Sequence, residues 1–301
     1  MANQRSWTRL SLVLLLAACA ACSSDRAAGP KATPGKPSPL PQIDVEQGIV
    51  YSTVSHRGLL MNAYSIEGAR NLPAVIVLHP GGFIAGDRGS VTGLARNLAL
   101  AHFAAFTIDY RIAPYPAAVY DTIAAIKFVK ASAERFHLDA AHIALFGVSA
   151  GGTIAASAAE LAGPPAAVQA LVSWSGIFDL RKAEQQQPEI FPFLVDDYVF
   201  GSSQAKGSPA RVGKASPIGQ VHAGGPPTLV ANARVELVPL EQAQAYVAKL
   251  QLLGTPSQLL TPAIGHAMAY LGTALGPTVS FLNRFLRSGL TASPPSPSPS
   301  L

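Results

Sequence analysis

A serine flanked by glycines is the residue in this sequence best suited to covalent chemistry. The segment Gly147-Val148-Ser149-Ala150-Gly151 follows the largely apolar run 142–146 and precedes a stretch of small residues that predicts a helix. On a sharp strand-to-helix turn, a serine is held in a strained, exposed position, and glycines two places on either side let the backbone pack tightly. The pattern predicts that Ser149 is a nucleophile for acyl transfer.

Acyl transfer also needs a base that accepts the serine proton. Two histidines follow Ser149 in the chain, His222 and His266. His266 comes shortly after the apolar pair Leu259-Leu260, where we expect a loop at the carboxyl end of a strand. His222 instead precedes the strand expected to begin at Thr228. We therefore predict that His266 is the base.

A carboxylate is needed to orient that histidine, and two acidic residues lie between Asp197 and His266. Glu236 follows the strand expected at 228–233, at a carboxyl strand end, where catalytic groups of open α/β sheets collect. Glu241 falls in the first turn of the next expected helix, where the helix dipole already explains an acidic side chain. The prediction is Glu236, with Glu241 as the alternative.

Two adjacent glycines predict a site for the oxyanion that forms during acyl transfer. The segment His79-Pro80-Gly81-Gly82-Phe83 directly follows the buried strand expected at 74–78. There the backbone N–H groups of Gly81 and Gly82, joined by that of Ala150, can approach the substrate oxygen. A plain Pro-Gly-Gly turn is the alternative interpretation.

The elements around these residues predict a mostly parallel, doubly wound α/β sheet. Residues 48–55 and 59–66 alternate apolar and polar side chains, which favours an antiparallel hairpin. Short, continuously apolar runs, separated by helical stretches such as 117–136 and 240–253, are typical of strands buried on both faces. Residues 181–220 fit neither pattern, and we expect a small insertion over the sheet edge. The apolar runs are 74–78, 104–108, 143–146, 171–174 and 228–231.

Taken together, these segments resemble the esterase and lipase group of the α/β-hydrolase superfamily, which includes hormone-sensitive-lipase-like carboxylesterases and the ferulate-esterase-like BD-FAE branch. The resemblance spans about residues 48–285 and implies hydrolysis of small carboxylic esters through an acyl-enzyme, with neither a metal nor an organic cofactor. It places Ser149 and His266 in the catalytic triad and Gly81, Gly82 and Ala150 in the oxyanion hole. The matching segments are 79–83 with Gly86-Asp87, Asp109-Tyr110-Arg111-Ile112-Ala113-Pro114, 147–152, Ala215-Ser216-Pro217-Ile218, Pro226-Pro227-Thr228-Leu229 and Gly265-His266.

The chain departs from that group at the acid, which in the family is usually an aspartate within an Asp-x-x-Val-Pro stretch. Counting forward from the strand at 228–233 puts Glu236 on the acid position. Counting back from Val238-Pro239 puts Val235 there instead, because the chain is one residue short. A glutamate has an extra methylene and can reach the histidine from a backbone shifted by one position. The sequence leaves both alignments open.

The first residues predict export. Arg5 and Arg9 precede the apolar run 10–18, which is too short to span a bilayer. Leu16-Ala17-Ala18-Cys19 resembles the lipobox of bacterial lipoproteins, which implies cleavage before Cys19 and a lipid anchor in a bacterial cell membrane. An ordinary secretory signal is the alternative. We expect a signal peptide over 1–18, a Pro-rich tether over 19–41, one domain over 42–289 and a disordered Pro/Ser tail over 290–301.

Composition narrows the function less than the motifs do. The formal net charge is +5, but the basic residues are scattered, which argues against a nucleic-acid partner. Both cysteines, Cys19 and Cys22, lie in the N-terminal segment, so no disulfide is expected in the domain. The rival hypotheses are a catalytically weak envelope protein that uses this fold for binding, and a serine peptidase.

Several other side chains are expected to stabilise the fold or to border the site rather than to react. We expect Asp109 and Arg111 to form an internal ion pair or hydrogen bonds that brace the loop near Ser149, and Asp121 to take part in that bracing or to cap its helix. Trp174 and Phe178 are expected in the core. Phe191, Phe193 and Tyr198 either line an acyl pocket or anchor the insertion to the domain.

Overall fold

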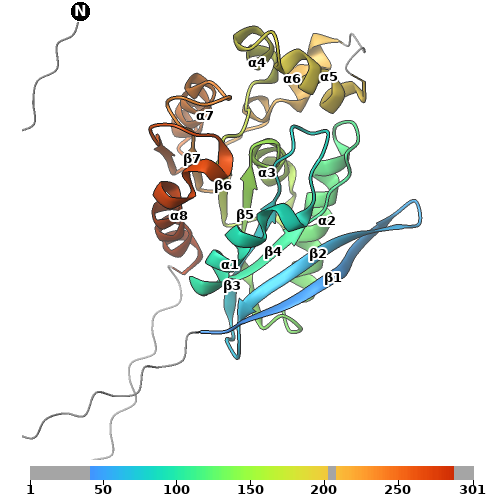
Figure 1. Ribbon diagram of the computed structural model, residues 1–301, viewed down its shortest axis with the longest axis vertical. Coiled ribbons are helices and arrows are strands. Elements are labelled where there is room, and N and C mark those ends of the chain that lie inside the picture. Colours follow the sequence, from blue (N-terminus) through green and yellow to red (C-terminus); the bar gives the residue numbers. More distant parts are fainter. Residues whose placement is uncertain (1–40, 203–207, 288–301) are drawn as a thin grey trace, which may run out of the picture. The chain divides into compact units, whose positions relative to one another are not determined.

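A single eight-stranded sheet organises residues 41–202 and 208–287, which the computed structural model describes (Figure 1). Its strand order is β1-β2-β4-β3-β5-β6-β7-β8. The first two strands form the predicted antiparallel hairpin, β2 runs antiparallel to β4, and every other neighbouring pair is parallel. The strands are β1 (Ile43–Val54), β2 (Arg57–Ile66), β3 (Leu72–Leu78), β4 (Ala104–Ile108), β5 (Leu138–Val148), β6 (Ala170–Trp174), β7 (Thr228–Ala231) and β8 (Ser257–Leu260).

The central strands are buried on both faces, as their continuous apolar runs predict. Every residue of β3, β4, β6 and β7 is buried. Because successive side chains of a strand point to opposite faces, Ile76 and Leu78 enter one apolar cluster while Val75 and Val77 enter the other. Strand β5 begins at Leu138, five residues before the apolar run that predicted it, because Leu138 itself pairs with Leu72 of β3.

Helices cover both faces of the sheet. Helices α2, α3 and α7 contribute to the cluster on one face, and α1 and α8 contribute to the cluster on the other. Helix α2 ends at Ala131, short of the predicted end at 136, and a turn then leads to Phe136, whose ring packs edge-on against Phe106. These helices are α1 (Thr92–Leu100), α2 (Ala117–Ala131), α3 (Ala150–Leu161), α7 (Leu240–Leu252) and α8 (Leu271–Leu286).

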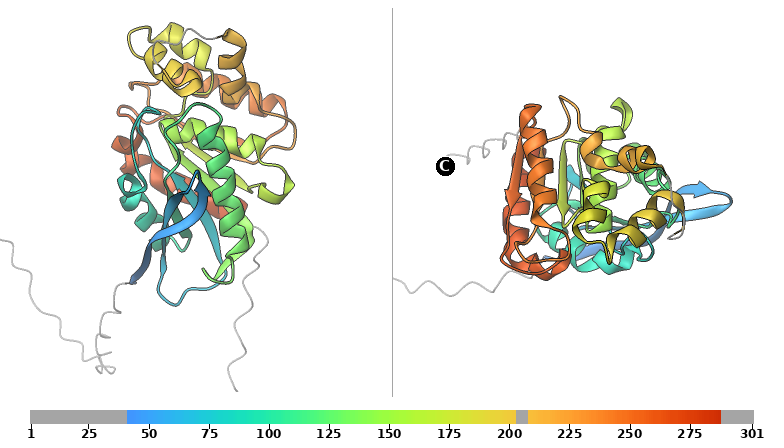
Figure 2. Two further views of the ribbon diagram at one scale, coloured as in Figure 1. Left: turned by 90° about the vertical axis from the view of Figure 1, so that its right-hand side faces the viewer. Right: turned by 90° about the horizontal axis from the view of Figure 1, so that it is seen from above.

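The expected insertion is a helical cap rather than an irregular segment at the sheet edge. Helices α4 (Leu180–Gln186), α5 (Phe191–Phe200) and α6 (Pro209–Ala215) lie beyond the carboxyl ends of the strands, above the sheet in Figure 1 and in the left view of Figure 2. The backbone N–H of Tyr115, in the loop after β4, donates to the carbonyl of Tyr198 and ties α5 to the domain. Helices this short show too little periodicity to be recognised from sequence.

The predicted signal peptide, nearly all of the tether and the Pro/Ser tail lie outside the described residues. The described residues begin at Pro41, the last residue of the predicted tether, and end at Arg287.

Candidate active site

Ser149 occupies the turn between β5 and α3. Its backbone has φ 53° and ψ −121°, a strained region for a residue with a side chain. Its N–H donates to the carbonyl of Trp174 at 2.7 Å, which fixes the turn to the neighbouring strand. A Cβ at Gly151 would lie 2.5 Å from the carbonyl oxygen of His79, so only glycine lets α3 start this close to β3. The turn holds the half-buried Ser149 at the carboxyl edge of the sheet.

Glu236 lies in the loop after β7, and His266 lies in the adjacent loop after β8. His266 contacts both Glu236 and Ser149. The distance from His266 Nε2 to Ser149 Oγ is 2.9 Å, and His266 Nδ1 lies 3.0 Å from Glu236 Oε2. With a carboxylate accepting at Nδ1, that nitrogen carries the hydrogen and Nε2 is left to accept from the serine. The Glu236 side chain is fully buried, and that of His266 is 29% exposed.

The structure brings Glu236, and neither alternative residue, to the histidine. Val235 pairs with Ile264 in a short extension of the parallel pairing, its carbonyl accepts from Gly265, and its side chain is 63% exposed. This bridge joins the two loops directly before Glu236 and His266. Glu241 is exposed in the first turn of α7.

The glycine-rich loop after β3 borders the same space. Gly81, Gly82 and Phe83 all have positive φ (148°, 59° and 69°), and the carbonyl of Gly81 accepts from the N–H groups of Ile84 and Ala85 at 3.1 Å each. Among the described residues, no hydrogen bond takes up the N–H of Gly81, Gly82 or Ala150. All three residues line the pocket beside Ser149, so the predicted donors are available there without a competing acceptor in the described part of the chain.

The buried residue His79 holds this loop in place through stacking and hydrogen bonds. Its ring is buried and stacks on Tyr110, with centroids 4.1 Å apart, and the Tyr110 hydroxyl donates to the His79 carbonyl at 2.8 Å. His79 Nδ1 lies 2.8 Å from the carbonyl of Pro80 and donates to it. Burial lowers the pKa of His79, so the ring stays neutral and the loop is held without a buried charge.

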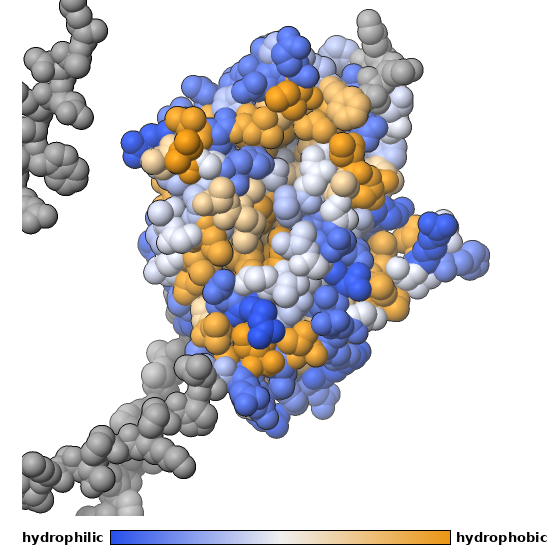
Figure 3. Space-filling model, in the orientation of Figure 1, coloured by the Kyte–Doolittle hydropathy of each residue, from blue (hydrophilic) through white to orange (hydrophobic). Residues whose placement is uncertain are grey.

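An apolar pocket of about 240 Å³ opens beside Ser149 and His266. The cap and the surrounding loops supply its walls, among them Phe83, Ile177, Phe191, Leu194 and Leu237. The cap also carries exposed apolar side chains, and apolar surface appears in the upper part of Figure 3, where the cap lies in Figure 1.

Three aromatic residues were predicted either to line an acyl pocket or to anchor the insertion. Two of them each take one of these roles. Phe191 lines the pocket. Tyr198 is buried and stacks on Phe83, with centroids 4.2 Å apart, so it anchors the cap. Phe193 is 50% exposed. Trp174 and Phe178 are both fully buried in the core, as predicted.

Asp109 and Arg111 both form bracing interactions, as predicted, but each side chain bonds to a different element rather than to the other. Asp109 accepts from Arg88, in the turn before α1, with Nη1 to Oδ2 at 2.5 Å. Arg111 donates to Asp121 of α2, with Nη2 to Oδ1 at 2.7 Å, and Asp121 also accepts from the Arg111 backbone at 2.9 Å. The two ion pairs brace opposite sides of the segment after β4.

Sequence reasoning missed Ser175 and Tyr270, which contact the acid and the loop of the base. Ser175 directly follows β6, and its Oγ lies 2.7 Å from Glu236 Oε2 and 2.6 Å from the Tyr270 hydroxyl. A polar residue immediately after a buried parallel strand is a signal that could have identified Ser175. No comparable signal marks Tyr270.

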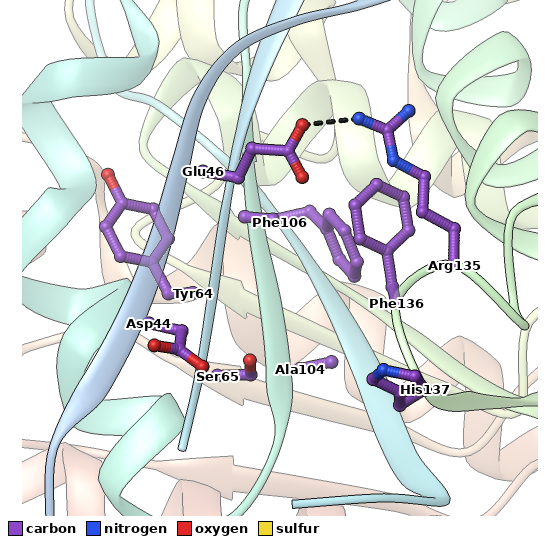
Figure 4. A pocket seen from close by; sticks show the side chains of 10 residues that line it. Asp44, Glu46, Tyr64, Ser65, Ala104, Phe106, Arg135, Phe136 and His137 are labelled. Carbon is purple, nitrogen blue, oxygen red and sulfur yellow. Dashed lines mark hydrogen bonds and ion pairs between the residues drawn. The ribbon is translucent and has the colours of Figure 1, made fainter. Parts of the chain in front are cut away.

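A second pocket, of about 200 Å³, lies at the opposite edge of the sheet, beside the first residue of β4 (Figure 4). An ion pair between Glu46 and Arg135 crosses it, above the packed rings of Phe106 and Phe136. Ser149 follows the other end of the parallel strands, so this pocket is separate from the active site. Within 41–202 and 208–287, no cluster of three or more His, Cys, Asp or Glu side chains is suited to a metal ion.

The strand order, the strained serine turn and the loops that carry Glu236 and His266 define an α/β-hydrolase fold. The chain belongs to the BD-FAE family, whose model matches residues 63–250. It is 30% identical over 240 residues to the esterase LipC of Mycobacterium tuberculosis, covering 72% of this chain and 59% of LipC. The chain thus spans less than two thirds of the length of that relative.

Solved structures agree on the fold. A truncated carbohydrate esterase from gut microbiota superposes with a TM-score of 0.70 at 19% identity, covering 83% of this chain and 98% of that one. Esterase 2 of Thermogutta terrifontis, in a form phosphonylated by sarin, superposes with a TM-score of 0.66 at 20% identity, covering 85% and 99%.

Proposed function

We propose that this protein is a serine carboxylesterase in which Ser149 is the nucleophile, His266 the general base and Glu236 the orienting acid. The observation that carries the proposal is the continuous path Ser149 Oγ–His266 Nε2 (2.9 Å) and His266 Nδ1–Glu236 Oε2 (3.0 Å). Both distances are within hydrogen-bond reach in the absence of substrate. The family and the esterase relatives support the same reaction.

In the first half-reaction, Ser149 Oγ attacks the ester carbonyl while its proton moves to His266 Nε2. The buried Glu236 carboxylate stabilises the imidazolium and holds its orientation. The carbonyl oxygen, now negative, accepts from the free N–H groups of Gly81, Gly82 and Ala150. His266 then gives its proton to the departing alcohol, and the Ser149 acyl-enzyme remains.

The second half-reaction repeats these steps with water. His266 takes a proton from the water, which attacks the acyl carbon, and the same N–H groups hold the second oxyanion. When the bond to Ser149 Oγ breaks, His266 returns the proton to that oxygen and the carboxylic acid leaves. Every proton passes through His266, so no other titrating group is needed.

The pocket favours small esters. Its volume of about 240 Å³ and its apolar walls suit a short acyl group, with the alcohol portion directed towards solvent. An acetylated saccharide of the cell envelope is one such substrate, and the fold match to a carbohydrate esterase supports this class.

The test is hydrolysis of short p-nitrophenyl esters by the purified chain, beside Ser149→Ala and with a fluorophosphonate probe. We expect turnover and labelling in the parent and neither in Ser149→Ala. A folded parent that neither turns over these esters nor takes up the probe would refute the enzyme and favour a binding role.

We also propose that the chain is exported and anchored through a lipid on Cys19. The support is the charged and apolar N-terminal pattern with the lipobox-like Leu16-Ala17-Ala18-Cys19. No helix within the described ranges is long and apolar enough to cross a membrane. Detergent-phase partitioning of the protein from bacterial membranes should be lost in Cys19→Ser, and partitioning that survives this substitution would contradict the anchor.

A further inference from the structure

Ser175 joins the segments that carry the acid and the base. It is fully buried directly after β6, its φ is 53°, and its N–H donates to the carbonyl of Ala231 at 2.8 Å. Its Oγ accepts from the N–H of Ala267, the residue after His266, at 2.9 Å. The same oxygen lies 2.7 Å from Glu236 Oε2. One side chain thus touches the carboxylate and the backbone of the histidine loop.

The directions of these hydrogen bonds follow from counting protons. Glu236 is an acceptor when ionised, so the single Ser175 hydroxyl proton is donated to Oε2. The 2.6 Å contact between Ser175 Oγ and the Tyr270 hydroxyl then needs its proton from Tyr270, whose hydroxyl also lies 3.0 Å from the Ala231 carbonyl and shares its one proton between these two acceptors. Burial raises the pKa of Tyr270, and the nearby Glu236 charge raises it further, so the phenol keeps this proton at neutral pH. The result is a chain of donors from Tyr270 through Ser175 to Glu236.

Glu236 depends on this chain because its carboxylate has few other partners. Oε2 carries the bonds to both His266 and Ser175, whereas the buried Oε1 has no hydrogen-bond partner among the described residues. A glutamate also has one more rotatable bond than an aspartate, so its carboxylate needs an additional fixed contact to stay in place. Ser175 provides this contact from a rigid position at the end of a central strand.

We propose that Ser175 and Tyr270 are positioning residues that hold the Glu236 carboxylate against His266, with Ser175 acting directly and Tyr270 through Ser175. This inference rests on the proposed esterase function. It predicts that both hydroxyl groups act on turnover through Glu236, while contributing little to substrate binding, because neither residue lines the pocket beside Ser149.

The experiment compares Ser175→Ala and Tyr270→Phe in the parent and in a Glu236→Ala background, with a p-nitrophenyl ester as substrate. In the parent we expect Ser175→Ala to lower kcat about 10- to 100-fold, as loss of an outer supporting partner typically does, and Tyr270→Phe to lower it less. KM should stay within about twofold. In the Glu236→Ala background, which retains residual turnover, each substitution should change kcat by less than about twofold.

Ser173→Ala is the matched control. Ser173 is a fully buried serine within β6, two residues before Ser175, and its Oγ has no hydrogen-bond partner among the described residues. Removal of its hydroxyl should leave kcat unchanged. Thermal unfolding of every variant measures any loss of overall stability separately from the change in kcat.

The proposal is overturned if Ser175→Ala keeps a parent-like kcat, or if it lowers kcat by the same factor with and without Glu236. If Ser175→Ala does not fold, Tyr270→Phe decides alone, and a parent-like kcat for that variant overturns the proposal. Failure of the esterase function itself would look different, because the unsubstituted parent would then show no Ser149-dependent turnover or labelling.

Discussion

Substitution of Gly81 by alanine tests the oxyanion site most directly. A Cβ at this position would lie 1.8 Å from the carbonyl oxygen of Ala85, whereas real Cβ contacts are essentially never below 3.0 Å. The obstacle is backbone, so the loop has to move by roughly 1.2 Å merely to reach the 3.0 Å limit, and further for an ordinary contact. A donor at about 2.9 Å from the oxyanion would then lie beyond hydrogen-bond distance.

The loss of one such donor costs about 3 kcal/mol of transition-state stabilisation, so we expect Gly81→Ala to lower kcat on p-nitrophenyl acetate roughly 100- to 1,000-fold. Gly82→Ala is the comparison. Its φ of 59° also strains an alanine, by roughly 1–2 kcal/mol, but the nearest atom to its Cβ is a flexible Leu194 methyl at 3.3 Å. We expect a modest loss of stability and less than about a tenfold loss of kcat.

Steady-state kinetics of both variants, with urea unfolding to verify that each is folded, decide the outcome. A folded Gly81→Ala protein with kcat within threefold of the parent would refute the assignment of this loop as the oxyanion site. Equal losses in both variants would show that positive φ, rather than the clash with Ala85, causes the effect.

Three further predictions concern the pocket, the bracing pairs and pH. Leu194→Ala should enlarge the pocket and raise kcat/KM for p-nitrophenyl hexanoate relative to acetate about tenfold, measured by a chain-length series; an unchanged ratio would place the acyl group elsewhere. Arg111→Ala should lower the free energy of unfolding by about 2–3 kcal/mol in urea, because it leaves the Asp121 carboxylate, 3% exposed, without its cation; a loss below 0.5 kcal/mol would contradict this. Burial raises the pKa of Glu160 above its ordinary value of 4.5, although the adjacent His222 opposes this. The folded state therefore binds this proton more tightly than the unfolded state, and the stabilisation, complete below pH 4.5, is lost as pH rises through the folded pKa. Urea titrations from pH 4 to 7 should show this loss in the parent and a smaller one in Glu160→Gln; equal slopes would exclude Glu160 as the cause.

Local sequence patterns predicted the mostly parallel sheet and most of the strands and helices in the order in which they follow one another along the chain. Runs such as 74–78 and 104–108 are apolar at every position because helices cover both faces of a central strand. The cap was not predicted as helices, since α4 and α6 have only seven residues each. The partners of Asp109 and Arg111 could not be identified from the sequence, because opposite charges close in sequence still turn towards different elements.

For the candidate site, the available residue types can be read from the chain alone: one serine on a glycine turn, two later histidines and few acidic residues. They pointed to Ser149 and His266, because strand-to-helix turns and strand ends are marked by local residues. The folded chain was needed to show that Glu236, rather than Val235 or Glu241, supplies the group that faces His266. The reason is physical: the pairing of Val235 with Ile264 sets how far each loop extends, and such pairing between distant segments leaves no periodicity in the chain. The contacts of Ser175 with Glu236 and Tyr270 join residues 61 and 95 positions apart, so they too arise only in the folded protein.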